Sequence, residues 1–205
     1  CFGKLQVLSV AAHKLILLPA DPDCTPVTST ALADSLQSIG LLGAASDING
    51  ATYYPTGDHF LQLITFLGCS PMIELEPPAD HEMLADASRE GRFCHVFLEC
   101  SDTLRFRSDP RTPTPRCPQC RAPLADWPTI LQAWRDDPAN DHCHCPQCNA
   151  SARITELGFR KTAGFGRNFV EIRGIHPSEA VPVEALLNTL KTLTHCAWST
   201  IYIKE

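Results

Sequence analysis

Four cysteines in the middle of the chain have a spacing that could bind a metal ion. Cys117-Pro-Gln-Cys120 and Cys145-Pro-Gln-Cys148 are identical motifs, and 24 residues separate them. Each C-x-x-C turn can present two thiolates to one ion, and two such turns complete the tetrahedral coordination that Zn²⁺ adopts in structural sites. Four thiolates leave no position open to water or substrate. The spacing therefore predicts one structural zinc ion per chain rather than a catalytic one.

Further possible ligands lie immediately before the second motif, where Asp141-His142-Cys143-His144 precedes Cys145. We expect the ligands to be the four cysteines of the two matched motifs, because a symmetrical set requires no special explanation. Cys143 or His144 is the alternative ligand. A redox function of the thioredoxin type is disfavoured, since that chemistry uses a single C-x-x-C motif at the start of a helix.

The two motifs resemble the knuckles of the zinc ribbon, a family of small metal-stabilised β modules found in transcription, translation, nucleic-acid and adaptor proteins. The resemblance covers residues 111–155 and implies an inserted module of this kind. Two details depart from the family pattern. The spacer exceeds the usual length of about fifteen to twenty residues. Arg121 and Asn149 stand where the family often has glycine, and Asn149 accepts the left-handed conformation more readily than Arg121 does.

The composition is that of a globular protein, with 205 residues of which 44% are hydrophobic. No run approaches the roughly 18 apolar residues of a membrane span, so a membrane partner is not expected. Eleven cysteines that include a zinc quartet favour a reducing cytoplasm. No signal peptide is recognisable, although a chain that opens at Cys1 can lack its natural beginning. A lipidated Cys1 is the disfavoured alternative.

Basic residues gather around the two motifs. Residues 1–88 hold two bases and ten acids, a net charge of −8, whereas residues 89–205 hold fifteen bases and thirteen acids, a net charge of +2. Such a cluster could bind the phosphates of nucleic acid, neutralise the thiolates, or contact an acidic protein surface. The candidate contact surface consists of Arg116, Arg121, Arg153 and Arg160.

The remaining sequence is predicted to contain both helices and strands. Thr28 or Ser29 can cap a helix that ends at Gly40, and Asp58 can cap another that ends at Gly68. Apolar periodicity predicts strands at 5–18, 93–100, 153–159, 168–175 and 198–204, and further helices at 127–135 and 183–193.

This order of elements predicts an α+β fold, with helices packed on a mixed sheet and an inserted four-cysteine zinc ribbon. We expect residues 1–107 and 152–205 to form the α+β body around one shared sheet. Residues 108–151 are expected to form the inserted ribbon, and the first part of this range, 108–116, is expected to be a proline-rich linker.

A few other residues could carry chemistry. Cys69 lies at a predicted turn and is a candidate nucleophile if His59 or His195 activates it, although burial at a tight turn explains it as well. A second metal site could form from Cys94, His95, Cys100, His195 and Cys196 if the fold brought them together. Core packing is the simpler expectation for these residues, and Gly164–Asn168 is expected to connect a hairpin.

The interpretation that combines these features is a zinc-binding cytoplasmic protein that acts mainly in recognition of a partner protein. A recognition protein explains these features more simply than an enzyme does. The first alternative is an enzyme with a cleft in the α+β body that uses Cys69 with a histidine or a carboxylate. The second alternative is nucleic-acid binding through the basic ribbon surface. The sequence does not identify the partner, the substrate or the oligomeric state.

Overall fold

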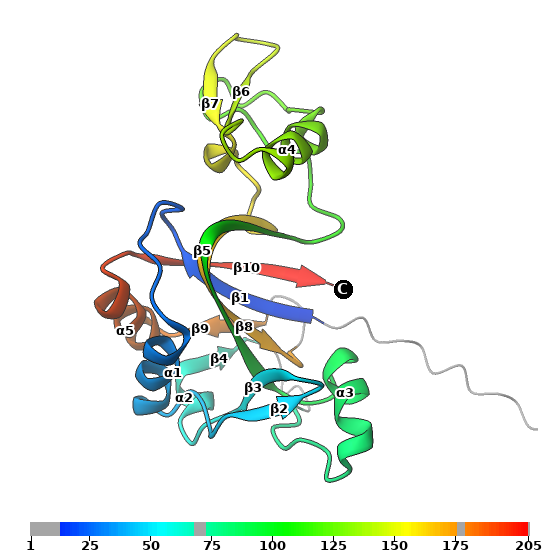
Figure 1. The fold of residues 1–205 in the computed structure, drawn as a ribbon, viewed down its shortest axis with the longest axis vertical. Coiled ribbons are helices and arrows are strands. Elements are labelled where there is room, and N and C mark those ends of the chain that lie inside the picture. The colour runs from blue at the N-terminus through cyan, green and yellow to red at the C-terminus, as the bar shows by residue number, and fades with distance from the viewer. Residues whose placement is uncertain (1–12, 68–72, 176–178, 205) are drawn as a thin grey trace, which may run out of the picture.

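A six-stranded sheet forms the body of the protein (Figure 1). The computed structural model describes residues 13–67, 73–175 and 179–204, and every structural statement concerns these residues. The strand order is β10-β1-β8-β5-β3-β2, and all of these neighbours pair antiparallel. The strands are β1 (His13–Pro19), β2 (Ser46–Ile48), β3 (Ala51–Pro55), β5 (His95–Ser108), β8 (Ala163–Arg173) and β10 (Trp198–Lys204). The predicted α+β class is confirmed, and the sheet that we expected to be mixed is antiparallel.

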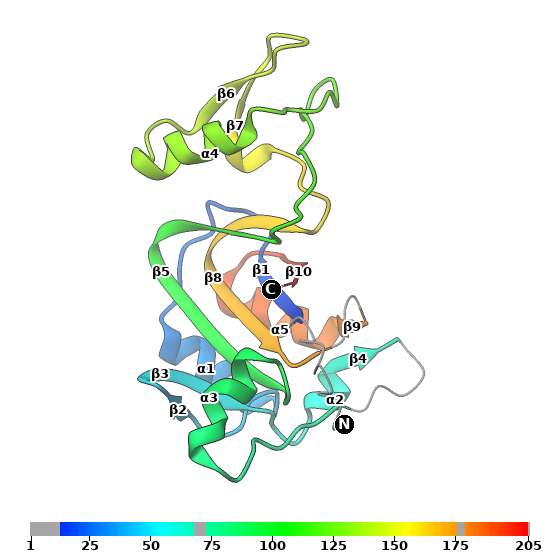
Figure 2. The ribbon, with the colours of Figure 1, turned by 90° about the vertical axis from the view of Figure 1, so that its right-hand side faces the viewer.

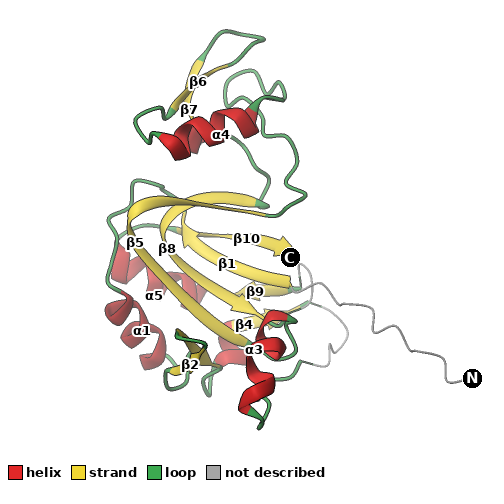
Figure 3. Ribbon diagram, turned by 45° about the vertical axis from the view of Figure 1, so that its right-hand side comes forward, coloured by secondary structure: helices red, strands yellow, loops and turns green. Residues whose placement is uncertain are grey.

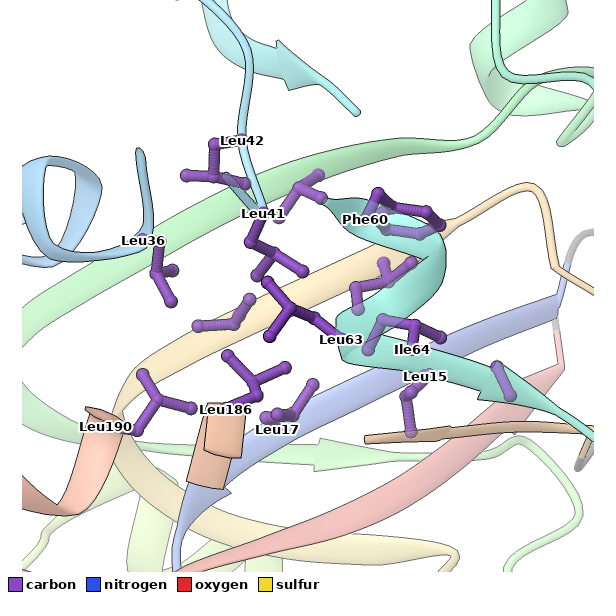
Figure 4. Close-up of a cluster of buried hydrophobic side chains, with 14 of the residues drawn as sticks. Leu15, Leu17, Leu36, Leu41, Leu42, Phe60, Leu63, Ile64, Leu186 and Leu190 are labelled. Carbon is purple, nitrogen blue, oxygen red and sulfur yellow. The ribbon is translucent and has the colours of Figure 1, made fainter. Parts of the chain in front are cut away.

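One face of this sheet is covered by helices α1 (Ser29–Ser38) and α5 (Glu184–Thr194), as Figure 3 shows. The start of α1 is as predicted, because the Thr28 hydroxyl accepts a hydrogen bond from the amide of Ala31 at 3.1 Å. Leucines from both helices interdigitate with leucines of β1 (Figure 4). The labelled side chains include Leu15, Leu17, Leu36, Leu41, Leu42, Leu63, Leu186 and Leu190. These contacts form the main hydrophobic core.

Smaller elements complete the body. Helix α2 (Phe60–Leu63) leads directly into β4 (Ile64–Phe66), which pairs with β9 (Ala180–Pro182). Helix α3 (His81–Arg89) packs beside the β2–β3 hairpin. No helix in the described ranges is long and apolar enough to cross a membrane.

Several local predictions are wrong because tertiary pairing overrides the local pattern. The helix expected from Asp58 towards Gly68 stops at Leu63, since the following residues pair with β9 instead. Gly164–Asn168 lies within β8 rather than in a hairpin connection. The strand expected at 153–159 is limited to β7 (Ser151–Arg153), after which Ile154–Glu156 forms a 3₁₀ helix.

Strands β5 and β8 continue beyond the sheet as a curved two-stranded extension (Figure 2). The curve begins at a bulge, where four residues of β5 between Cys100 and Arg105 face one residue of β8. We refer to 105–108 and 163–166 together as the arm. The arm turns back toward the sheet. Beyond its end, the amide of Tyr202 in β10 donates a hydrogen bond to the Lys161 carbonyl at 3.0 Å.

The arm leads into the segment that contains both cysteine motifs. This segment holds α4 (Trp127–Asp136), which matches the helix expected at 127–135, and a hairpin of β6 (His142–His144) with β7. It has a hydrophobic core of its own. The arm supplies Phe106 and Phe165 to that core, which extends through Leu131 and Trp134 of α4. The segment is thus packed on the arm as well as joined to it by the chain.

Candidate metal centre

The structure brings together the four cysteines of the two motifs. Their sulfur atoms all lie within 4.8 Å of one another. Among the described residues, these four cysteines are the group that could hold a metal ion. The Sγ atoms of Cys117 and Cys148 are 3.9 Å apart, and those of Cys120 and Cys145 are 3.6 Å apart. Each motif therefore contributes one sulfur to each of these close pairs, and the convergence of all four sulfurs fits a single tetrahedral ion.

Both motifs form the same knuckle. In the first, the amide of Arg121 donates to the Cys117 carbonyl at 3.0 Å, and the amide of Cys117 donates to the Ala122 carbonyl at 2.9 Å. The second knuckle repeats these bonds around Cys145 at 2.8 and 2.9 Å. Arg121 and Asn149 both adopt the left-handed conformation, with φ of +63° and +57°. Arginine thus occupies a conformation that glycine would accept without steric cost.

The knuckle backbone also favours the thiolate form of the first cysteine in each motif. The amide of Cys120 donates to the Cys117 sulfur and lowers the pKa of this thiol to about 7. The amide of Cys148 likewise lowers the pKa of Cys145. Backbone N–H groups directed at sulfur stabilise its negative charge. The all-sulfur donor set and its electrostatics fit Zn²⁺.

The two alternative ligands are placed elsewhere. Cys143 is buried in the hydrophobic core of the segment, and burial raises the pKa of its thiol. His144 is exposed on β6. Neither residue belongs to the group of four sulfurs.

Aromatic side chains, among them Trp127, Trp134 and Phe165, line the interior of the segment. Trp134 is 6% exposed and meets Phe165 edge-on, with ring centroids 5.3 Å apart. Trp127 packs against Phe106 of the arm, at 6.3 Å between centroids. The side chains of Trp134 and Phe165 are therefore not available to stack with an external ligand.

Three of the four basic residues predicted as a contact surface lie together. Arg116, Arg121 and Arg160 line an open hollow of about 680 Å³ beside the first knuckle. One guanidinium N–H of Arg116 donates to the Arg121 carbonyl at 2.9 Å. Arg153 is engaged differently, because it forms ion pairs with Asp23 of the body and Asp141 of the segment. It links these two parts of the protein.

The other predicted site residues are dispersed. Cys69 lies outside the described residues, so its role as a nucleophile stays a prediction. The second metal site does not form in the part of the chain that the structure describes: Cys94 is buried against the Gly174 carbonyl, and Cys196 forms a disulfide with Cys24. Cys100 is half-buried. His195 ends α5 in a left-handed conformation.

Sequence reasoning missed two features. The Cys24–Cys196 disulfide joins residues 172 positions apart, and no local motif connects them. The second feature is a buried pair in which the Ser88 hydroxyl lies 2.7 Å from Nε2 of His95. Nδ1 of His95 faces the Phe93 carbonyl at 2.9 Å, so Nδ1 carries the proton and the hydroxyl donates to Nε2. Burial lowers the pKa of His95 to about 4, which keeps the ring neutral.

Comparisons of this chain with models of protein families, with curated proteins and with solved structures gave no match. The resemblance to zinc ribbons therefore rests on the two knuckles and on the four-cysteine cluster that they form.

Proposed function

We propose that the four cysteines bind one structural Zn²⁺ and that residues 108–151 act as a zinc-stabilised recognition module for a partner protein. The observation that carries this proposal is the closed cluster of four sulfurs. Four protein ligands leave no coordination position for a substrate, so the metal would stabilise a surface rather than carry out a reaction.

The size of the segment supports a structural role for the metal. A module of about forty residues buries too little apolar surface to be stable on its own, and a metal commonly provides the missing stabilisation. Only short regular elements lie near its two knuckles: α4 and β6 lie between them, and the second knuckle connects β6 with β7. Zinc would hold both knuckles in their present arrangement.

The hollow beside the first knuckle is the proposed contact surface. The charged residues of its lining are three arginines, Arg116, Arg121 and Arg160, and one acid, Glu156. This excess of positive charge suits an acidic segment of a partner protein. A zinc ion with four thiolates carries about two negative charges, so part of the arginine charge would offset the metal centre itself. Arg160 also has a left-handed backbone, with φ of +53°, which costs free energy where no glycine is present.

Cytoplasmic location remains a prediction on which two observations point in opposite directions. A zinc–thiolate site requires reduced cysteines, which the cytoplasm provides, whereas the Cys24–Cys196 disulfide is typical of an oxidising compartment. Peptide mapping of protein alkylated at the moment of cell lysis would decide between the two.

The metal is tested by native mass spectrometry with elemental analysis of protein purified without added metal. We expect one zinc per chain. Cys117→Ser and Cys148→Ser should each lose the zinc and unfold at least the ribbon, because three thiolates bind it much more weakly. Cys143→Ala is the matched control and should retain the zinc. Full zinc content and unchanged thermal unfolding in both serine variants would contradict the four-cysteine assignment.

The contact surface is tested with two probes of equal length, a deca-glutamate peptide and a decathymidine oligonucleotide. We expect the peptide to bind and Arg116→Gln or Arg160→Gln to weaken its binding. Arg111→Gln should have no effect, because Arg111 is exposed outside the hollow. Tighter, strongly salt-dependent binding of the oligonucleotide would instead support the nucleic-acid alternative.

A further inference from the structure

The sheet face opposite α1 and α5 carries a group of charged side chains. Residues alternate between the two faces of a strand, so Leu15 and Ile172 point toward the helices while their neighbours point away. Two hollows lie on the outer face, of about 600 and 370 Å³. Both are lined by Arg107, Glu171 and Arg173, so they meet at these side chains. We refer to the two hollows together as the trough.

The two arginines of the trough are held in fixed positions. Arg173 lies over the ring of Phe97, 4.4 Å from its centroid, and forms an ion pair with Glu171. Arg107 lies over the ring of Phe169, 5.5 Å from its centroid, and pairs with Glu99 through one terminal nitrogen. A guanidinium that is stacked on an aromatic ring and anchored at one edge loses little conformational entropy when it binds a ligand.

Both guanidinium groups keep donors available. A guanidinium has five N–H groups, and within the described part of the chain Arg107 uses one nitrogen and Arg173 uses Nε for the bonds to their glutamates. Arg173 is 24% exposed and Arg107 is 38% exposed at the side chain. The remaining N–H groups can therefore reach a ligand in the trough without breaking either ion pair.

The charges around Glu171 keep this carboxylate ionised. Burial raises the pKa of Glu171, but the neighbouring charges of Arg173 and Lys14 outweigh this effect and hold it below its usual value. Nζ of Lys14 lies 3.1 Å from the carboxylate. The lining of the trough thus holds four bases, Lys14, Arg89, Arg107 and Arg173, and two acids, Glu99 and Glu171.

The rest of the larger hollow is mainly apolar. Phe97 and Phe169 are part of its lining, together with Ile48 of β2 and Ala85 of α3. Its volume falls within the range of roughly 300 to 1,000 Å³ that is usual for small-molecule sites. A pocket that joins an apolar wall to paired guanidinium donors selects for a ligand with an apolar body and one planar anionic group.

We propose that the trough binds a small organic acid, with its carboxylate held by Arg107 and Arg173 and its apolar body against Phe97 and Phe169. This site is separate from the proposed ribbon surface and does not depend on the metal. It would give the α+β body a ligand-binding role in addition to recognition by the ribbon.

The test measures the binding of benzoate to the whole metal-loaded chain by NMR chemical-shift titration and isothermal titration calorimetry. Benzamide is the matched neutral probe of the same shape, and inorganic phosphate is an anion without an apolar body. We expect saturable binding of benzoate, and binding that is at least about tenfold weaker for the other two probes. Benzamide lacks the negative charge that the arginines bind, and phosphate lacks the apolar body that the phenylalanines contact. Binding of benzamide as tight as that of benzoate would overturn the proposal, as would tighter binding of phosphate or no saturable binding of benzoate.

Variants locate the site. Arg107→Met and Arg173→Met should each weaken benzoate binding by about tenfold or more, since each removes a charge-assisted contact. Arg105→Met is the matched control, because Arg105 is exposed on the same strand and does not line the trough. Thermal unfolding of every variant checks that it is folded. Equal binding by all three folded variants and the unmodified protein would refute the assignment.

Discussion

Removal of the Cys24–Cys196 disulfide should destabilise the body strongly. The bond closes a loop of 172 residues, which is most of the chain. In the chain-entropy description, closing a loop of this length restricts the unfolded state by about 17 cal/mol/K, or about 5 kcal/mol at 25 °C. Residual structure in the unfolded chain reduces such values. We therefore expect a loss of about 3 to 5 kcal/mol in the free energy of unfolding.

The assay is urea denaturation of Cys24→Ala, Cys196→Ala and the double variant at a constant zinc concentration. Circular dichroism and tryptophan fluorescence monitor the unfolding. Peptide mapping of the unmodified protein first identifies the cross-linked pair. Trp198 is a suitable local reporter, because its indole N–H donates to the Thr194 hydroxyl at 2.9 Å, close to the bond. Coincident transitions by the two probes would support analysis as a two-state process.

The comparison of single and double variants provides the critical result. Either single substitution already breaks the bond, so all three variants should lose nearly the same free energy. Cys100→Ala, which removes a half-buried free cysteine, should cost much less. Losses that simply add in the double variant, or a double variant as stable as the unmodified protein, would refute the reasoning.

Two further substitutions test local geometry. Gly164→Ala should cost about 1 to 3 kcal/mol in thermal or urea unfolding, because its Cβ would lie 2.7 Å from a methyl group of β1. Gly158→Ala is the matched control, with its nearest atom at 3.9 Å, and an equal loss in both variants would contradict this explanation. Arg121→Gly should relieve the left-handed strain of the first knuckle by about 1 kcal/mol, which corresponds to about fivefold tighter zinc binding in a chelator competition. Unchanged or weaker zinc binding in this variant would show that the knuckle is not strained.

Local signals in the sequence predicted those features that depend on nearby residues. The Thr28 cap predicted the start of α1, where its hydroxyl accepts from the amide of Ala31. The two matched motifs predicted the four-cysteine cluster, because each motif fixes two ligands within a single turn. In each case, residues only a few positions apart determine the conformation.

Features that depend on distant pairing could not be predicted in this way. The segment 64–66 has a helical pattern in the sequence but forms β4, since β9 lies beside it in the fold. Gly164 has the appearance of a turn residue, yet it lies within β8 because Arg107 of β5 pairs with it. Here the free energy of tertiary contacts exceeds a weak local preference.

The sequence by itself therefore determined the four thiolates that could hold a metal, the start of α1 and the division of charge along the chain. Only the tertiary structure decided which arginines share a surface, which cysteines form a disulfide and which charged side chains line the trough. Arg107 and Arg173 are 66 positions apart in the sequence and lie near opposite ends of the β5–β8 ladder, and the curve of the arm beyond the bulge brings them to the same hollows. Spacing along the chain can fix a turn, but a site between distant strands depends on the register and curvature of the whole sheet.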